Sequence, residues 1–163
     1  MHCGRQIAAG GDPKAKPTLE QAIRQFHDGL ASKKKEDREK TLRSVLPNKK
    51  DVETLFPKHA AKLWPLWEKG NDFLLENVDN IAREVTRGGG IKEVKAIDMR
   101  KEKNPQGYKE LFEIIPKDIP VFDYSIRHVN GDGSGGGSYV YLNQRWLWIK
   151  DLDSFPRILE KLK

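Results

Sequence analysis

Residues that could do acid–base chemistry gather in the C-terminal half of the chain. Alternation along a predicted strand over residues 121–129 places Tyr124 and His128 on one face, about 13 Å apart at the rise of a strand. With His27 from the first helix they could line one cavity, and Asp123 is a candidate base if its face points inward. A buried imidazole or carboxylate there would have a shifted pKa and could abstract a proton. The alternative is that Tyr124 and His128 are core residues with satisfied polar ends.

Two tryptophans could instead bind a flat ligand. Trp146 and Trp148 are same-face neighbours on a predicted strand, about 6.6 Å apart at the rise of a strand. This spacing suits the stacking of sugar rings or apolar molecules. The predicted ligand-binding set is therefore Trp146, Trp148, Tyr124, His128 and Trp67. The same tryptophan pair could also fill the core between the sheet and a helix, or form the face of a homodimer.

Positive charge is concentrated in the N-terminal helical region. The chain carries a net charge of +6, and the surplus lies within residues 14–62, so a polyanion or an anionic surface could bind there weakly. Aromatic residues that could stack on bases are not interleaved with the lysines, which argues against nucleic acid as the partner. The alternative is a solvated helical face. The candidate polyanion-binding residues are Lys33, Lys34, Lys35, Lys49 and Lys50.

Other kinds of site find no support in the residue pattern. The four histidines are scattered without the spacing of metal ligands, so we expect no metal site and no cofactor. The glycine-rich segment 131–137 lacks the Lys and Ser/Thr that a phosphate-binding loop requires. We interpret it as a linker between neighbouring strands. The single cysteine, Cys3, rules out an internal disulfide.

The N-terminus is expected to be a tail. Residues 1–17 are predicted to form a disordered tail or tether ahead of a single domain over residues 18–163. Cys3 and the polar spacer after it look like the lipid-bearing end of a processed bacterial lipoprotein, although only two residues precede Cys3. Export and lipid tethering would therefore need missing upstream residues, and otherwise we expect a cytoplasmic protein. No apolar run is long enough to span a bilayer.

Helical periodicity dominates the first half of the chain. Thr18 and Gln21 form a capping-box pattern at the start of the first helix, and Asp51 could cap a short third one. Apolar residues then step by three or four positions from Leu63 to Val85, which predicts one continuous helix of about six turns. The expected helices span residues 18–30, 36–46, 52–56, 63–85 and 152–162.

Period-2 alternation takes over in the second half. Strands are expected over residues 91–100 and 121–129, and residues 108–115 are expected to form a short helix or a strand. Residues 138–150 predict a tight hairpin with its turn at Asn143-Gln144. Both faces of this hairpin are apolar, so we expect it to be covered on both sides.

This order of helices, strands and a tryptophan-rich hairpin resembles the cystatin-like, nuclear-transport-factor-2-like superfamily. The resemblance covers about residues 18–150 and depends on element order and on the run Tyr-Leu-Asn-Gln-Arg-Trp-Leu-Trp over Tyr141–Trp148. More narrowly, the chain looks like small exported bacterial proteins of unknown function in that group. The resemblance implies a curved sheet wrapped around a long helix, often with an apolar pocket at the open end, and it carries over no catalytic residue.

We therefore expect an α+β fold. N-terminal helices should pack on a curved, cone-like and mainly antiparallel sheet of about four strands, followed by a short C-terminal helix. The function favoured by these patterns is a non-catalytic binding or accessory module for a small apolar or sugar-like molecule, or for a protein partner. The alternatives are a small pocket enzyme that uses acid–base chemistry and a weak polyanion binder.

Overall fold

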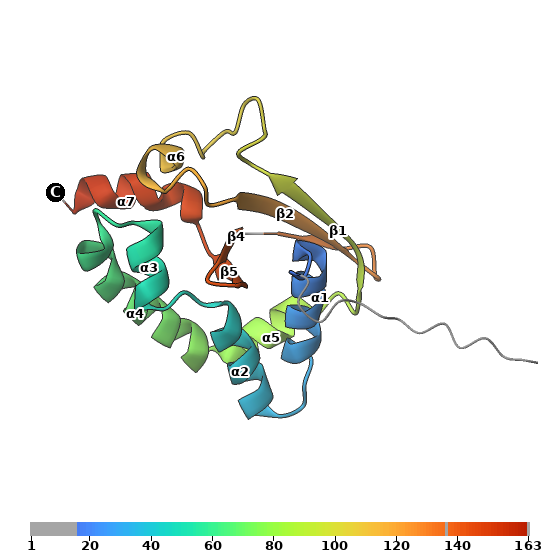
Figure 1. The fold of residues 1–163 in the computed structure, drawn as a ribbon. Coiled ribbons are helices and arrows are strands. Elements are labelled where there is room, and N and C mark those ends of the chain that lie inside the picture. The colour runs from blue at the N-terminus through green and yellow to red at the C-terminus, as the bar shows by residue number, and fades with distance from the viewer. Residues whose placement is uncertain (1–15, 136, 163) are drawn as a thin grey trace, which may run out of the picture.

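The computed structural model describes residues 16–135 and 137–162 and shows an α+β fold, as predicted (Figure 1). Residues 1–15 of the predicted tail, which include Cys3, lie outside the described residues. The helices are α1 (Leu19–Leu30), α2 (Lys35–Val45), α3 (Lys49–Leu55), α4 (Ala60–Glu76), α5 (Val78–Thr86), α6 (Leu111–Ile114) and α7 (Phe155–Lys161). The strands are β1 (Ile91–Asp98), β2 (Val121–His128), β3 (Gly133–Ser134), β4 (Ser138–Leu142) and β5 (Arg145–Ile149).

The strands form one open, antiparallel sheet in the order β1-β2-β4-β5. The short strand β3 also pairs with β2, opposite its C-terminal half, while β4 pairs with the N-terminal half. The glycine-rich segment is therefore more than the linker that the sequence predicted, because Gly133 and Ser134 extend the sheet. This pairing fixes Ser134 beside the end of β2.

The β4–β5 hairpin is built as the sequence predicted. Asn143 and Gln144 form its turn with φ values of 50° and 63°, the left-handed geometry that matches the twist of two-residue hairpins. Val140, Leu147 and Ile149 enter one hydrophobic cluster, whereas Tyr139 and both tryptophans of β5 belong to others on the opposite face. Helices α3, α4 and α7 lie on one side of the hairpin and α1 on the other (Figure 1).

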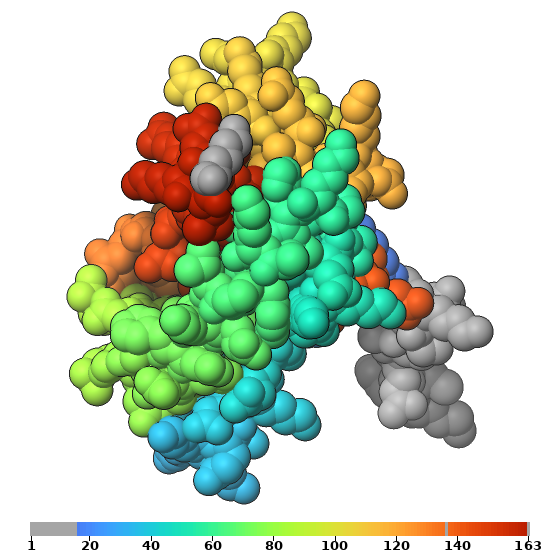
Figure 2. Space-filling model, turned by 90° about the vertical axis from the view of Figure 1, so that its left-hand side faces the viewer, coloured from blue at the N-terminus to red at the C-terminus, as the bar shows by residue number. Residues whose placement is uncertain are grey.

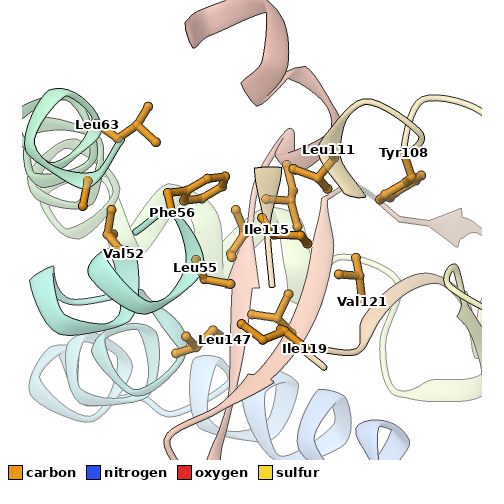
Figure 3. Close-up of a cluster of buried hydrophobic side chains, with 14 of the residues drawn as sticks. Val52, Leu55, Phe56, Leu63, Tyr108, Leu111, Ile115, Ile119, Val121 and Leu147 are labelled. Atoms are coloured by element: carbon orange, nitrogen blue, oxygen red, sulfur yellow. The ribbon is translucent and has the colours of Figure 1, made fainter. Parts of the chain in front are cut away.

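The larger hydrophobic cluster joins the N-terminal helices to the C-terminal elements. Val52, Leu55 and Phe56 point from the α3 region toward Leu147 of β5, and Leu111 and Ile115 approach from the α6 region (Figure 3). All of these side chains are buried. Burial contributes roughly 1.5–3 kcal/mol for each large side chain, and it holds the α3 and α6 regions against one face of the hairpin.

The prediction of one continuous helix over residues 63–85 is wrong in its middle. Helix α4 ends at Glu76 and α5 begins at Val78, with Asn77 between them in a non-helical conformation. The Asn77 side-chain amide donates to the Phe73 carbonyl at 2.8 Å, so the side chain competes for a helical acceptor. The apolar stripe continues across the break because Leu74 and Val78 still pack into the same cluster.

Asp51 is placed differently from the prediction. Asn48, not Asp51, is the N-cap of α3, and Asp51 completes a capping box by accepting from the Asn48 backbone N–H at 2.9 Å. The Asp51 carboxylate is fully buried, pairs with Arg145, and accepts from the Asn143 side-chain amide at 2.7 Å. These contacts tie α3 to the turn of the hairpin.

Local signals at the other helices agree with the structure more closely. Thr18 and Gln21 form both hydrogen bonds of the predicted capping box. The segment predicted as helix or strand is the short helix α6. None of the helices within the described ranges is long and apolar enough to cross a membrane.

Candidate functional site

One hollow between the sheet and the helices brings together several of the predicted site residues. Tyr124 and His128 of β2, Trp148 of β5 and His27 of α1 all line a pocket of about 300 Å³. We call this hollow the sheet–helix pocket. Tyr124 and His128 reach it because β2 alternates, as predicted, and its inward face carries them on the same side as Ile126.

The remaining walls of the sheet–helix pocket are mainly apolar. Helix α1 contributes Ile23 and Phe26 next to His27, because positions three and four residues apart share one helical face. Val85 of α5 and Tyr139 of β4 close the pocket from the helical and sheet sides. A mostly apolar concave surface with a few polar groups is the usual form of a small-molecule site.

The two histidines of this pocket lie side by side. The rings of His27 and His128 have centroids 6.0 Å apart and an interplanar angle of 40°. The residues are only 5% and 4% exposed, respectively. His128 Nε2 is hydrogen-bonded to Ser134 Oγ at 2.8 Å, so β3 orients the ring of His128. The pocket therefore contains an imidazole pair held by three separate elements.

Tyr124 is a neutral phenol in this environment. Burial raises the pKa of Tyr124 to about 12, and a hydrogen bond with the indole of Trp148 opposes that shift. Because an indole N–H can only donate, the Tyr124 oxygen is the acceptor of that bond. Burial also raises the pKa of Tyr139 well above its usual range. Neither tyrosine supplies a phenolate base near neutral pH.

Asp123 does not join the pair of Tyr124 and His128. The residues that line the sheet–helix pocket do not include Asp123, which lies on the opposite face of β2. Its Oδ1 atom accepts from the Tyr124 backbone N–H at 2.7 Å. The predicted acid–base set of Tyr124, His128 and Asp123 is therefore divided between the two faces of the strand.

Trp146 does not enter the sheet–helix pocket either. It is buried and its indole N–H donates to the Pro17 carbonyl at 2.8 Å. The Lys16 ammonium lies 3.8 Å from the centre of the Tyr141 ring beside it. Lys16 and Pro17, which the sequence placed in the tail, thus cover one edge of the hairpin. Trp146 lines a separate hollow of about 300 Å³ together with Phe26 and Val45, and only Trp148 of the pair lines the sheet–helix pocket.

Trp67 lines a different hollow, which lies between α4 and α7. Its ring stacks on Phe155 of α7 with centroids 4.5 Å apart. The hollow, here called the α4–α7 groove, has a volume of about 310 Å³, and Leu66 and Phe73 beside it are 48% and 64% exposed. Helices α4, green, and α7, red, share this face in Figure 2. Trp148 lines both this groove and the sheet–helix pocket and separates them.

The candidate polyanion-binding lysines fall into two groups. Lys33, Lys34 and Lys35 lie around the start of α2, whereas Lys49 and Lys50 begin α3, and all five are exposed. The 11 residues of α2 hold the two groups about 16 Å apart along its axis. Acidic side chains lie between them, and Glu39 approaches the Lys35 ammonium at 3.8 Å. Arg38, Lys40 and Arg43 also lie between the two groups, so the charge along α2 is mixed and polyanion binding stays a prediction.

Two residues that position the histidine pair were absent from the predicted site. Ser134 bonds His128, and Gly88 lies so close to the His128 ring that an added Cβ would be 2.4 Å from its Cγ atom. The sequence held a weak signal for each, a serine inside the glycine-rich segment and a glycine after α5. Neither signal could have indicated which side chain the residue would contact.

Neither a metal-binding cluster among the described residues nor a match to a known protein indicates the function of this chain. Within residues 16–135 and 137–162, no group of three His, Cys, Asp or Glu side chains could hold a metal ion. Comparisons with family models, with curated proteins and with solved structures found no match to this chain. The function is therefore inferred from the geometry of the site.

Proposed function

We propose that this protein is a non-catalytic binding module that takes up a small, mainly apolar ligand in the sheet–helix pocket. The observation that carries the proposal is the convergence of Tyr124, His128, Trp148 and His27 on one pocket of about 300 Å³. Pockets of this size with aromatic walls and few polar groups are typical of small-molecule sites. The resemblance to the cystatin-like, nuclear-transport-factor-2-like superfamily remains a separate proposal.

The charges around the pocket support binding rather than catalysis. Tyr124 is neutral, Asp123 lies on the other face of β2, and the carboxylate of Glu84 at the rim approaches the Arg87 guanidinium at 3.6 Å. A general base needs to lie within hydrogen-bond reach of the proton that it removes. The carboxylates that the sequence and the pocket rim offer are directed elsewhere. His27 and His128 are also candidate bases, but His27 Nε2 and His128 Nδ1 are buried beneath the pocket surface and His128 Nε2 bonds Ser134, so we favour the binding module over the pocket enzyme.

A dye-binding experiment tests this proposal. N-phenyl-1-naphthylamine is neutral and fluoresces in apolar surroundings, so we expect its fluorescence to rise with the wild-type protein. The variant Ile126→Trp places an indole inside the sheet–helix pocket and should weaken dye binding at least tenfold. The matched control Ser125→Trp places the same indole on the outer face of β2, where Ser125 is exposed, and should bind as the wild type does.

Two results would contradict the proposal. The first is the absence of dye binding to a folded wild-type protein. The second is equal dye binding by the wild type and the Ile126→Trp variant, which would assign the dye to another surface such as the α4–α7 groove. Circular dichroism of both variants confirms that the fold is retained.

A further inference from the structure

Two buried ring nitrogens at the sheet–helix pocket have no hydrogen-bond partner among the described residues. They are His27 Nε2 and His128 Nδ1. The other nitrogen of each ring has a polar neighbour, since His128 Nε2 bonds Ser134 and His27 Nδ1 lies 3.8 Å from Asp28 Oδ1. Native proteins rarely leave buried polar atoms unpaired, and each exception calls for an explanation. A group that does not belong to the described chain would satisfy both nitrogens.

The surrounding chain brings the two imidazoles together at the wall of the pocket. The Gly88 backbone packs against the His128 ring so closely that any larger residue would displace it. His27 lies on the buried face of α1 with Ile23 and Leu30. The ring centroids are 6.0 Å apart and both residues line the same pocket, so the two rings form one polar spot in a mainly apolar wall.

The charged and titratable groups around this spot leave it without an acidic partner. On α1, Asp28 is exposed and its nearest oxygen is beyond hydrogen-bond distance of His27. On the α5 side, Glu84 approaches Arg87 at 3.6 Å. On the sheet side, Tyr124 and Tyr139 are neutral because burial raises the pKa of each phenol. None of these side chains accepts a hydrogen bond from the two nitrogens, so a ligand could supply the acceptor.

One tautomer of each ring allows both unpaired nitrogens to donate to a ligand. A neutral imidazole carries one N–H, and the Ser134 hydroxyl can donate to His128 Nε2 when that N–H is on Nδ1. His27 can likewise carry its proton on Nε2. Both unpaired nitrogens then become donors, and a carboxylate offers two oxygen acceptors and no donor.

We propose that the sheet–helix pocket binds a small aromatic or aliphatic carboxylate. Its oxygens accept from His27 Nε2 and His128 Nδ1, and its hydrocarbon part packs against Tyr124, Ile126 and Trp148. The two nitrogens lie beneath the pocket surface, so binding includes a rotation of the rings, a kind of side-chain change that is common on binding. This inference rests on the proposed function and adds the chemical class of the ligand.

A matched pair of ligands tests the inference on the wild-type protein. 3-Phenylpropionate and its amide, 3-phenylpropionamide, have the same shape, but only the acid carries a carboxylate. Isothermal titration calorimetry at pH 7 with EDTA present should show the acid binding at least ten times more tightly. Equal affinities, or tighter binding of the amide, would overturn the carboxylate head group. The binding function itself would still stand if the neutral dye continued to bind.

Substitutions of the two histidines test whether these residues cause the preference for the acid over the amide. His27→Leu and His128→Leu should each remove most of the advantage of the acid over the amide. The advantage is the ratio of the two affinities within one variant, so a change in the pocket that affects both ligands equally does not alter it. The matched control is His59→Leu, because His59 lies outside the pocket at the start of α4 and should leave the preference unchanged. His27→Gln and His128→Gln keep a side-chain donor and should retain part of the preference, and a complete loss in both would contradict donation by the side chain.

The outcomes separate the two proposals. A preference for the acid that survives both histidine substitutions would overturn the inference. So would a preference that appears only when EDTA is replaced by zinc chloride, because the nitrogens would then be metal ligands. Failure of the wild type to bind either the dye or the two phenylpropionyl compounds would overturn the proposed function as well.

Discussion

Asp51 and the histidine pair are buried polar side chains that differ in how completely they are hydrogen-bonded. The Asp51 carboxylate is fully buried, and Arg145, Asn143 and the Asn48 backbone all bond it. The histidine nitrogens at the pocket lack such partners among the described residues. A buried polar group with complete partners stabilises one arrangement of the chain, whereas one with partners missing calls for an explanation, which here is the proposed ligand.

The Asp51 network gives a stability prediction. The variant Asp51→Asn should lower the free energy of unfolding by about 3–5 kcal/mol, because it leaves the Arg145 guanidinium partly buried without its partner. Urea unfolding followed by circular dichroism measures the change. The control Glu39→Gln removes a partly exposed carboxylate that lies near Lys35, and it should alter stability by less than about 1 kcal/mol. Equal effects of the two variants would contradict a structural role for Asp51.

The candidate site was only partly predictable at the residue scale. Strand alternation placed Tyr124 and His128 on one face of β2, and His27 was proposed to meet them. Ser134 could not be found in this way, because its contact with His128 depends on the pairing of β3 with β2. Asp123 was a candidate only on the condition that its own face pointed inward, because alternation gives two faces but does not say which one does.

Single elements show where sequence signals are strong. The turn at Asn143-Gln144 was predicted because two runs of aromatic and β-branched residues flank this pair. In the structure both residues adopt positive φ. The continuous helix over residues 63–85 was wrong because periodicity averages over many residues. It does not detect one side chain, that of Asn77, which bonds the Phe73 carbonyl.

The hairpin turn provides a prediction at the element scale. Gln144 has φ of 63° and is exposed, so Gln144→Gly should relieve an unfavourable left-handed conformation and raise the free energy of unfolding by about 1 kcal/mol. Gln144→Val should lower it, since a β-branched side chain tolerates that conformation least. Thermal and urea unfolding report both changes. A stabilising valine would show that the backbone conformation of the turn is not limiting. Asn143 is left intact because its amide bonds Asp51.

The whole molecule is organised around a hairpin that is covered on both faces. Val140 and Leu147 are paired across β4 and β5, and both are fully buried. Strands β1 and β5 both lie at the ends of the strand order, but Leu147 of β5 is buried, whereas Ala96 and Ile97 of β1 are exposed. Deeply buried segments open only when the protein unfolds globally, whereas exposed edges also open locally.

This organisation predicts the pattern of hydrogen exchange. In the native protein, the hydrogen-bonded backbone amides of β4 and β5 should exchange at least tenfold more slowly than those of β1 that bond to β2. Their exchange free energy should equal the free energy of global unfolding from urea titration. Mass spectrometry of peptides from residues 91–98 and 138–149 measures the difference. Equal protection of both segments would indicate that β1 and the hairpin unfold only together.

The sequence by itself determined the α+β class, most of the elements and the two-sided burial of the hairpin. Those features follow from periodicity and turn chemistry, which act between residues close along the chain. Only the tertiary structure decided that Trp146 and Trp148 line different hollows, and that Gly88, Ser134 and α1 enclose the histidine pair. The reason is physical, because a pocket is the space left between distant elements after packing, and local patterns do not encode that space.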